Sequence, residues 1–235
     1  MTPLLLDKIS KTRGQGLRAV KVLHEVSLAV AAGEFVLLEG PSGAGKTTLL
    51  AVAGGILTPE SGEVYLDGHR LHTGSRALDR RRRSKTVGFV FQRSNLLPFL
   101  SVRENILLMG RIAGLPSDVT LRDTEDLLSR LGLHGLRNRY PHELSCGEEQ
   151  RVAVVRALIH RPSVVLADEP TGSLDSRAGQ AVAESLAELA RMRGSAVIVA
   201  THDSRLAPFA SRIIKIEDGK IESEALGQQK SPGRG

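Results

Sequence analysis

A glycine-rich segment, Gly40–Thr47, constrains the fold of this chain more than any other feature. It matches the pattern G-x-x-x-x-G-K-[ST] at every fixed position. The apolar stretch Glu34–Glu39 before it predicts a buried strand, and Lys46–Leu57 after it carries apolar residues on one side, as a helix does. Glycines allow the backbone to turn back, so that successive N–H groups point inward and cradle phosphate oxygens. The segment therefore predicts a phosphate-binding loop between a strand and a helix.

The backbone and the side chains of this loop are expected to share the binding of a nucleoside triphosphate. The positive end of the following helix adds to the field of the loop amides. The ammonium of Lys46 would neutralise charge on the β- and γ-phosphates, and the hydroxyl of Thr47 would bind Mg²⁺. GTPases and small-molecule kinases share such a loop, so the reaction stays open at this point. The residues expected at the nucleotide are Gly40, Pro41, Ser42, Gly43, Ala44, Gly45, Lys46, Thr47 and Thr48.

Composition excludes several other classes of protein. Of the 235 residues, 41% are hydrophobic and 25% are charged, which is ordinary for a soluble globular chain. No apolar run approaches the roughly 18–20 residues that a membrane-spanning helix requires. Met1–Ser10 contains no basic leader followed by an apolar block, so no signal peptide is predicted. The single cysteine, Cys146, rules out an intrachain disulfide and a cysteine-rich zinc site, and it fits a reducing compartment.

The positive charge is concentrated in one tract. The formal net charge is +6, and residues 76–85 alone carry six positive charges and one aspartate. The chain has no Trp, two Tyr and five Phe, too few aromatic rings for the stacking platforms that bind single-stranded nucleic acid. A specific nucleic-acid partner is therefore not expected. Arg80–Arg83 within the tract is interpreted as a solvated helical face, with anionic lipid headgroups as the alternative contact.

Strand and helix patterns alternate along the chain and are interrupted by a helical region. Val87–Phe91 predicts a strand, whereas residues 96–160 show helical periods only. Ser163–Ala167, a helix near Ser176–Arg193 and Ala196–Ala200 then form a strand–helix–strand unit, which a right-handed crossover makes parallel. The sequence thus predicts an α/β core with an all-helical insertion. Smaller features are a strand at Val64–Leu66 before a tight turn at Asp67-Gly68, a hairpin turn at Glu217–Lys220 and a disordered tail at Gln228–Gly235.

Two consecutive carboxylates, Asp168 and Glu169, follow the strand predicted at Ser163–Ala167. Adjacent strand residues point to opposite sides, so the two carboxylates cannot perform the same task. One can hold the shell of Mg²⁺, and the other can act as a base toward an attacking water. The alternative, a solvated loop start, is less favoured downstream of a phosphate-binding loop.

Two further polar residues follow strands of the same predicted core. His202 comes just after Ala196–Ala200, and the carboxyl ends of parallel strands face the place where open α/β sheets bind ligands. This placement favours contact with a γ-phosphate over a surface role. Gln92 ends Val87–Phe91, and its amide can offer an oxygen to Mg²⁺ or orient water, although an ordinary loop glutamine is the alternative.

Ser145 and Glu148 lie just before a helical stretch and match the S-x-x-E pattern of a capping box. A helix N-terminus with a serine is also an anion site. The segment is far along the chain from Lys46 and carries no base or metal ligand. It is therefore either only a cap, or it meets phosphate that belongs to another chain.

Together, these motifs resemble those of ABC-transporter ATP-binding subunits over about residues 4–223. Finer features resemble the branch that serves lipoprotein release, macrolide-type export and related cell-division complexes, in which the ATPase is a separate chain beside a membrane permease. The resemblance implies an α/β fold: a P-loop NTPase (RecA-like) core with a parallel sheet, an N-terminal antiparallel β part and an inserted all-helical subdomain at about residues 93–160. The motifs are Gly40–Thr47, Gln92, Leu144–Glu148, Val164–Pro170, Ser173–Asp175 and His202.

The resemblance also implies a role for each motif residue. Glu169 would be the general base and His202 the γ-phosphate contact, with Thr47 and Gln92 at Mg²⁺ and Asp168 holding its water shell. Two ATP molecules would lie in a head-to-tail homodimer, each also held in trans by the neighbouring chain. The residues acting in trans would be Ser145, Gly147, Glu148 and Asp175, although Asp175 is also placed to cap a helix.

Three positions depart from the family pattern. The mildest is Glu148, where many relatives have Gln, which is a common variant in this branch. Arg13 stands where relatives usually place an aromatic ring under adenine, and its guanidinium can also stack on a base. Cys146 replaces a glycine of the usual Ser-Gly-Gly. If that position needs a positive φ or a very close phosphate approach, its Cβ would cost about 1 kcal/mol or more and weaken dimer closure.

The expected function is an ATPase domain, residues 1–227, that drives a separate integral membrane permease through ATP-dependent dimer closure. It would lie in the cytoplasm, peripheral at the inner face of the cell membrane. A regulatory or cell-division ATPase with a non-transporting partner is the alternative, and a soluble ABC ATPase acting on nucleic acid or ribosomes is less favoured. The permease would dock on Asn95–Ile112, where Leu96, Leu97, Phe99 and Leu100 are either exposed or buried within the insertion.

Overall fold

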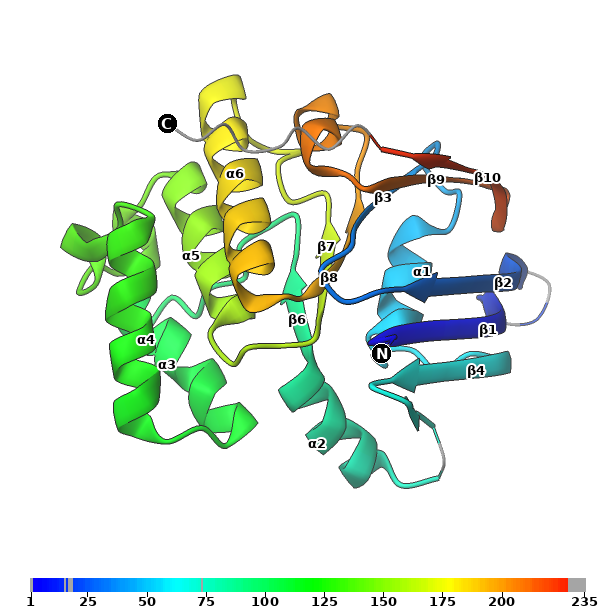
Figure 1. Ribbon diagram of the computed structural model, residues 1–235, viewed down its shortest axis with the longest axis horizontal. Coiled ribbons are helices and arrows are strands. Elements are labelled where there is room, and N and C mark those ends of the chain that lie inside the picture. The colour runs from blue at the N-terminus through cyan, green and yellow to red at the C-terminus, as the bar shows by residue number, and fades with distance from the viewer. Residues whose placement is uncertain (1, 15, 17–18, 73, 228–235) are drawn as a thin grey trace.

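Two β-sheets and six α-helices make up the computed structural model, which describes residues 2–14, 16, 19–72 and 74–227 (Figure 1). The tail predicted to be disordered, residues 228–235, lies outside the described residues. Within the described part of the chain, no helix combines the length and the apolar character needed to cross a membrane.

The larger sheet has six strands in the order β10-β9-β3-β8-β7-β6. Neighbouring strands from β9 to β6 run parallel, with Val164 of β7 opposite Ala196 of β8, which confirms the predicted parallel unit. The last strand, β10, is antiparallel to β9 across the hairpin turn predicted at Glu217–Lys220. The bounds are β3 Phe35–Glu39, β6 Val87–Val90, β7 Val164–Asp168, β8 Ala196–Ala200, β9 Arg212–Glu217 and β10 Lys220–Leu226.

The smaller sheet is antiparallel and is formed largely by the N-terminal part of the chain, as expected from the resemblance. Its order is β2-β1-β4-β5, and β4 and β5 are joined by the predicted turn at Asp67-Gly68. The bounds are β1 Leu4–Arg13, β2 Val20–Val30, β4 Ser61–Leu66 and β5 His69–Arg70.

Helices fill the sequence between β6 and β7, which confirms the predicted all-helical insertion. Basic α2, by contrast, lies before β6 and buries no residue along its length, as predicted for a solvated face. The helices are α1 Lys46–Ala53, α2 Arg76–Thr86, α3 Val102–Ala113, α4 Ser117–Arg130, α5 Cys146–Leu158 and α6 Ser176–Arg193, with 3-10 turns η2 His134–Leu136, η3 Pro141–Glu143 and η4 Ser204–Phe209.

Helix α1 is shorter than the sequence pattern predicts, since it ends at Ala53 rather than at Leu57. Two consecutive glycines cause the early end. Gly55 has a left-handed backbone with φ 66°. Gly54 lies so close to the core that an added Cβ would meet the ring of Phe89 at 1.9 Å. The chain therefore leaves the helix where its backbone packs against the central sheet.

The two faces of the larger sheet belong to two different hydrophobic clusters, because successive side chains of a strand point to opposite faces. Val36 and Leu38 of β3 pack with α1 and the smaller sheet, whereas Leu37 packs with α3, α4, α5 and α6. Figure 1 shows the sheet between α1 and that group of helices. Helices α1 and α5 consequently begin on opposite faces of the sheet.

Candidate functional site

The loop after β3 requires glycine at positions where the chain turns sharply and approaches other strands. Gly43 and Gly45 have left-handed backbones, with φ 86° and 102°. A Cβ on Gly40 would lie 2.1 Å from the carbonyl oxygen of Ile216, and one on Gly45 would lie 2.7 Å from that of Val22. A residue with a Cβ would not fit at either position, because the loop backbone lies directly against β9 at Gly40 and against β2 at Gly45.

The ammonium of Lys46 folds back over this loop. Its Nζ donates hydrogen bonds to the carbonyl oxygens of Gly40 at 2.6 Å and Pro41 at 3.0 Å. The exposed stretch Pro41–Gly43 thus forms a rim around a fixed positive charge, while Ala44 and Thr48 are buried beneath it. A loop of inward amides with a lysine at its centre can hold a chain of phosphates.

The Thr47 hydroxyl donates a hydrogen bond of 3.2 Å to Oδ1 of Asp168 at the end of β7. Burial raises the pKa of Asp168 above its ordinary value, and the neighbouring Glu169 carboxylate raises it further. A carboxylate that lacks full solvation and faces a hydroxyl is an oxygen donor set that suits a hard cation such as Mg²⁺. The two residues therefore fit the metal that the sequence predicts.

Glu169 follows Asp168 in a left-handed conformation, with φ 46°, and its N–H donates to the Ala200 carbonyl at 2.8 Å. Its carboxylate accepts hydrogen bonds from the Thr201 hydroxyl at 3.0 Å and from Nδ1 of His202 at 2.9 Å. The two neighbouring carboxylates thus bind different partners, as predicted, but strand alternation is not the reason, because β7 ends at Asp168 and Glu169 has a left-handed backbone.

Gln92 lies on the exposed loop after β6 and faces the same space as Glu169. A Cβ on Gly172 would lie 3.5 Å from Oε2 of Glu169 and 3.6 Å from Nε2 of Gln92. The backbone oxygen of Gln92 also accepts a hydrogen bond from the Ser173 hydroxyl. The structure therefore places the side chains of Gln92 and Glu169 next to each other, beside Gly172.

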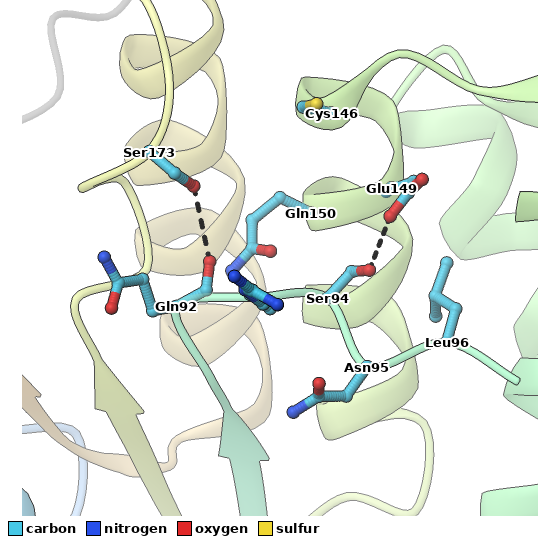
Figure 2. Close-up of a pocket in the computed structure, with 9 residues that line it drawn as sticks. Gln92, Ser94, Asn95, Leu96, Cys146, Glu149, Gln150 and Ser173 are labelled. Atoms are coloured by element: carbon cyan, nitrogen blue, oxygen red, sulfur yellow. Dashed lines mark hydrogen bonds between the residues drawn. The ribbon is translucent and has the colours of Figure 1, made fainter. Parts of the chain in front are cut away.

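A pocket of about 310 Å³ is lined by Gln92, by the residues that follow it and by the first turns of α5. Figure 2 shows the side chains that line it. Ser94 donates a hydrogen bond of 2.6 Å to Glu149 across the pocket. Gln150 donates to the Phe91 carbonyl at 2.6 Å, which ties α5 to the end of β6. A shift of the Gln92 loop is thereby linked to the helical insertion.

Ser145 caps α5 as the sequence predicts, with the complete capping box. Its hydroxyl accepts the Glu148 N–H at 3.3 Å and donates to the Glu148 carboxylate at 2.8 Å. Hydrogen bonds from Ser145 lower the pKa of Glu148. Gly147 is buried against α6, where an added Cβ would lie 2.8 Å from Cβ of Ala178. The cap is therefore rigid, and its serine is exposed.

Backbone strain is expected at Cys146 if this position needs a positive φ, and the structure shows that it does not. Cys146 is the first residue of α5 and has no positive φ, so its Cβ fits an ordinary helical conformation. Its side chain is exposed and is one of those that line the pocket in Figure 2.

Ser145 and Lys46 do not share one site within the chain, because α5 and α1 begin on opposite faces of the larger sheet. Asp175 is the N-cap of α6, where its Oδ1 accepts the Ala178 N–H at 2.8 Å. Both Ser145 and Asp175 are exposed. Their local capping roles are present, and their solvent-facing positions leave them available to a second molecule.

Arg13 is exposed at the end of β1, paired with Val20 across the hairpin. The same end of β2 contains Val22, whose carbonyl oxygen closely approaches the loop at Gly45. Arg13 therefore belongs to the strand end that borders the phosphate-binding loop.

The sequence interpretation missed the residues that fix the carboxylate of Glu169 through hydrogen bonds. Thr201 and Asp203 flank His202, and their hydroxyl and carboxylate form a network with Thr171 and Arg205. The position next to a predicted site residue was the available signal for Thr201 and Asp203. Asp203, two residues before Arg205, is a local partner, but the backbone carbonyls that Arg205 also binds, those of Thr171, Asp175 and Ser176, come from a distant segment that no local pattern indicates.

The sheet order and the loop geometry place this chain among P-loop nucleotide-binding proteins. The ABC transporter family model matches residues 23–172. The chain is 41% identical over 223 residues to the hemin import ATP-binding protein HrtA of Staphylococcus epidermidis, covering 94% of this chain and 99% of that protein. It is 42% identical over 219 residues to HrtA of Staphylococcus aureus strain MRSA252, covering 93% and 98%.

Solved structures agree with this result. A dimeric post-hydrolysis state of the ATP-binding cassette MJ0796, bound to ADP and Pi, matches with a TM-score of 0.86 and 34% identity, over 97% of this chain and 100% of that one. CbiO1 of Clostridium perfringens, part of the ABC transporter complex cbiONQ, matches with a TM-score of 0.83 and 26% identity, over 96% and 88%. The chain belongs to the ABC transporter family. It is the ATP-binding, ATP-hydrolysing component of such a transporter, as the motifs predicted.

Proposed function

We propose that two copies of this chain close head to tail around two ATP molecules and thereby drive a separate membrane permease. Residues 1–227 act as one ATPase domain in this proposal. The observation that carries it is the exposure of Ser145 on the sheet face opposite the phosphate-binding loop. A serine-capped helix start is an anion site, and in one chain it has no phosphate to bind.

Each site combines two surfaces. The loop Gly40–Thr48 and its lysine bind the phosphates from one chain. Arg13, at the bordering strand end, stacks on the adenine ring through its guanidinium plane. From the other chain, the first turn of α5 binds the γ-phosphate. The start of α6 lies at the contact between the two chains, the dimer seam. The residues acting in trans are Ser145, Gly147, Glu148 and Asp175.

Hydrolysis depends on residues of the first chain. Bound Mg²⁺ would compensate phosphate charge beside Thr47, Asp168 and Gln92. Glu169 is the general base: Thr201 and His202 hold its carboxylate, which accepts a proton from the attacking water. His202 is the γ-phosphate contact, since its side chain is 78% exposed, whereas that of Glu169 is 18% exposed. Loss of the bridging phosphate then favours the open dimer.

The permease docks on the insertion near the pocket of Figure 2. Phe99 carries this assignment, because it is 70% exposed in a loop before α3. Leu96, Leu97 and Leu100 are half-buried, and Leu96 packs against the core. Of the four apolar residues considered from the sequence, only Phe99 is therefore exposed. Docking would hold the ATPase at the inner face of the cell membrane.

A substitution at Phe99 tests this docking. Phe99→Ser should abolish co-purification with the integral membrane partner while the thermal midpoint of the isolated chain stays unchanged. Ile56→Ser is the matched control, since Ile56 is 48% exposed but lies beyond α1, away from the insertion. Retention of the membrane partner by Phe99→Ser would place the permease contact elsewhere.

A cargo of the hemin class is the candidate that the relatives support, since the HrtA proteins are named for hemin import. Export or lipoprotein release remains the alternative, from the finer motifs of the sequence. Hemin should stimulate ATP hydrolysis by the membrane-reconstituted complex if the cargo is of that class. Transport of labelled hemin into or out of vesicles would give the direction, and a partner that moves nothing would indicate a regulatory role.

The central test is Glu169→Gln in the full-length chain. We expect this variant to bind ATP, to lose hydrolysis by at least about a hundredfold, and to accumulate as an ATP-dependent dimer on a sizing column. Glu188→Gln is the matched control, because Glu188 is an exposed residue of α6. Wild-type turnover in Glu169→Gln would place the base elsewhere, and a monomer under all conditions would contradict the dimer.

A further inference from the structure

Arg205 lies where three segments of the site meet. It belongs to η4, the 3-10 turn Ser204–Phe209 that follows His202. Its Nη1 donates hydrogen bonds to the carbonyl oxygens of Asp175 at 2.8 Å and Ser176 at 3.2 Å. Its Nη2 reaches the Thr171 carbonyl at 3.3 Å. One guanidinium therefore binds backbone carbonyls within the loop between β7 and α6 and at the start of α6.

The same guanidinium is fixed by Asp203. Nε of Arg205 lies 2.8 Å from both carboxylate oxygens of Asp203, and Nη2 lies 2.6 Å from Oδ2. Hydrogen bonds from Arg205 hold the pKa of Asp203 down at about 2. The pair is half-enclosed, with side chains that are 24% and 9% exposed. The planar guanidinium of arginine carries five N–H donors on three nitrogens, so it can bind the Asp203 carboxylate and the carbonyls at once. The ammonium of a lysine has a single nitrogen and cannot reach all of them.

The backbone of α6 makes room for this contact at Gly179. A Cβ there would lie 2.0 Å from Nη1 of Arg205 and 2.3 Å from its Cζ. Gly179 is helical and has no positive φ, so neither turn geometry nor backbone strain requires a glycine. The missing side chain is explained by the guanidinium that occupies its place.

The network continues from Asp203 to the proposed base. The Asp203 N–H donates to Oγ1 of Thr201 at 3.0 Å, and the Thr201 hydroxyl donates to Oε2 of Glu169 at 3.0 Å. The buried Thr171 hydroxyl also donates to the Asp203 carboxylate. Arg205 thus connects the carboxylate that faces the water to the carbonyl of Asp175, which is proposed to lie at the dimer seam.

We propose that Arg205, accommodated by Gly179, is a positioning residue that couples closure at Asp175 to the alignment of Glu169 and His202; this inference rests on the proposed roles of those three residues. Movement of the α6 start on dimer closure is transmitted through the guanidinium to the loop 201–203. The base is thereby aligned only when the seam is closed. Arg205 touches no substrate in this proposal and acts through its neighbours.

Arg205→Lys keeps the charge beside Asp203 but loses the fork onto the three carbonyls. In the full-length chain we expect kcat to fall on the order of tenfold or more, since small misplacements of catalytic groups are costly. KM for ATP should stay within about twofold, because the phosphate-binding loop is untouched. Arg212→Lys is the matched control: Arg212 is 23% exposed, pairs with Glu34 and donates to the Ala29 carbonyl far from the site.

Gly179→Ala provides a second, independent variant. The added methyl should displace the guanidinium from the α6 carbonyls, which a flexible side chain permits without unfolding. Alanine is also the better helix former, so the thermal midpoint should stay equal or rise. We expect the same selective loss of kcat as in Arg205→Lys. Gly135→Ala is the control, since a Cβ added at Gly135 would meet nothing within 4 Å.

The two variants make the inference falsifiable. Wild-type kcat in both Arg205→Lys and Gly179→Ala would overturn it, as would equal changes in kcat and KM. A merely structural role predicts a lower thermal midpoint in Arg205→Lys and none of the kcat loss in Gly179→Ala. Failure of the proposed function is distinct, because it would appear as full hydrolysis by Glu169→Gln whatever Arg205 does.

Discussion

Glu169 and His202 are joined by a 2.9 Å hydrogen bond, yet the carboxylate is 18% exposed and the imidazole 78% exposed. The bond therefore connects an enclosed group to one that faces solvent. The ring uses Nδ1 toward Glu169, which leaves Nε2 for an outside ligand. To donate at both nitrogens, the ring must carry a hydrogen on each of them.

Substitution of His202 separates its two contacts. His202→Ala should lower ATP turnover about a hundredfold, as expected for loss of one donor to developing phosphate charge. His202→Asn can place an amide N–H where Nδ1 lies, and so keep the bond to Glu169, but it cannot reach as far as Nε2. Steady-state hydrolysis should stay as low in His202→Asn as in His202→Ala. Recovery in the asparagine variant would mean that His202 only orients Glu169.

Lys46→Ala should abolish ATP binding. The ammonium is already held at the loop by the Gly40 and Pro41 carbonyls, so no ordering is needed before phosphate arrives. In a thermal-shift titration, Mg-ATP should raise the midpoint of the wild-type chain and leave that of Lys46→Ala unchanged. Lys85→Ala, at an exposed position of α2, removes the same charge and should retain the shift.

Asp168→Asn should stabilise the nucleotide-free chain and weaken Mg-ATP binding. Burial raises the pKa of Asp168, so this group stabilises the fold below the unfolded-state pKa, and that contribution is lost as pH rises through the folded-state value. At neutral pH the ionised carboxylate thus lowers the free energy of unfolding. The amide removes this cost together with the charge that suits Mg²⁺.

Chemical denaturation of Asp168→Asn at several pH values checks the sign. Its advantage over the wild type should be present at pH 7 and vanish below about pH 3.9, where aspartate in the unfolded chain is also protonated. Asp118→Asn, with a side chain 67% exposed, should show no such advantage. A lower free energy of unfolding in Asp168→Asn at pH 7 would contradict the assignment.

Two capping boxes of the same geometry allow the effect of a serine on helix stability to be distinguished from its effect on binding in trans. Ser101 with Glu104 caps α3, and Ser145 with Glu148 caps α5, each with a 3.3 Å bond from the glutamate N–H to the serine. Ser101→Ala and Ser145→Ala should each cost about 1 kcal/mol of unfolding free energy. In a Glu169→Gln background, only Ser145→Ala should reduce the ATP-dependent dimer on a sizing column. Equal dimer formation in both would leave Ser145 as a cap alone.

Local patterns carried most of the fold and much of the site. The phosphate-binding loop and the cap at Ser145 follow from contiguous residues. The different partners of Asp168 and Glu169 follow instead from the left-handed backbone of Glu169 just after β7. The end of α1 was misjudged because helical periodicity continues past Ala53, while Gly54 packs against Phe89 from a distant strand.

The sequence by itself determined the chemistry: a lysine and amides for phosphate, carboxylates for metal and water, and the order of strands and helices that presents them. Only the tertiary structure decided that Ser145 lies on the far face of the sheet from Lys46, and that Arg205 fills the place of a side chain at Gly179. The reason is physical. Short motifs encode conformation through neighbouring residues, whereas a shared face or a vacated Cβ position arises from contacts between segments far apart in the chain.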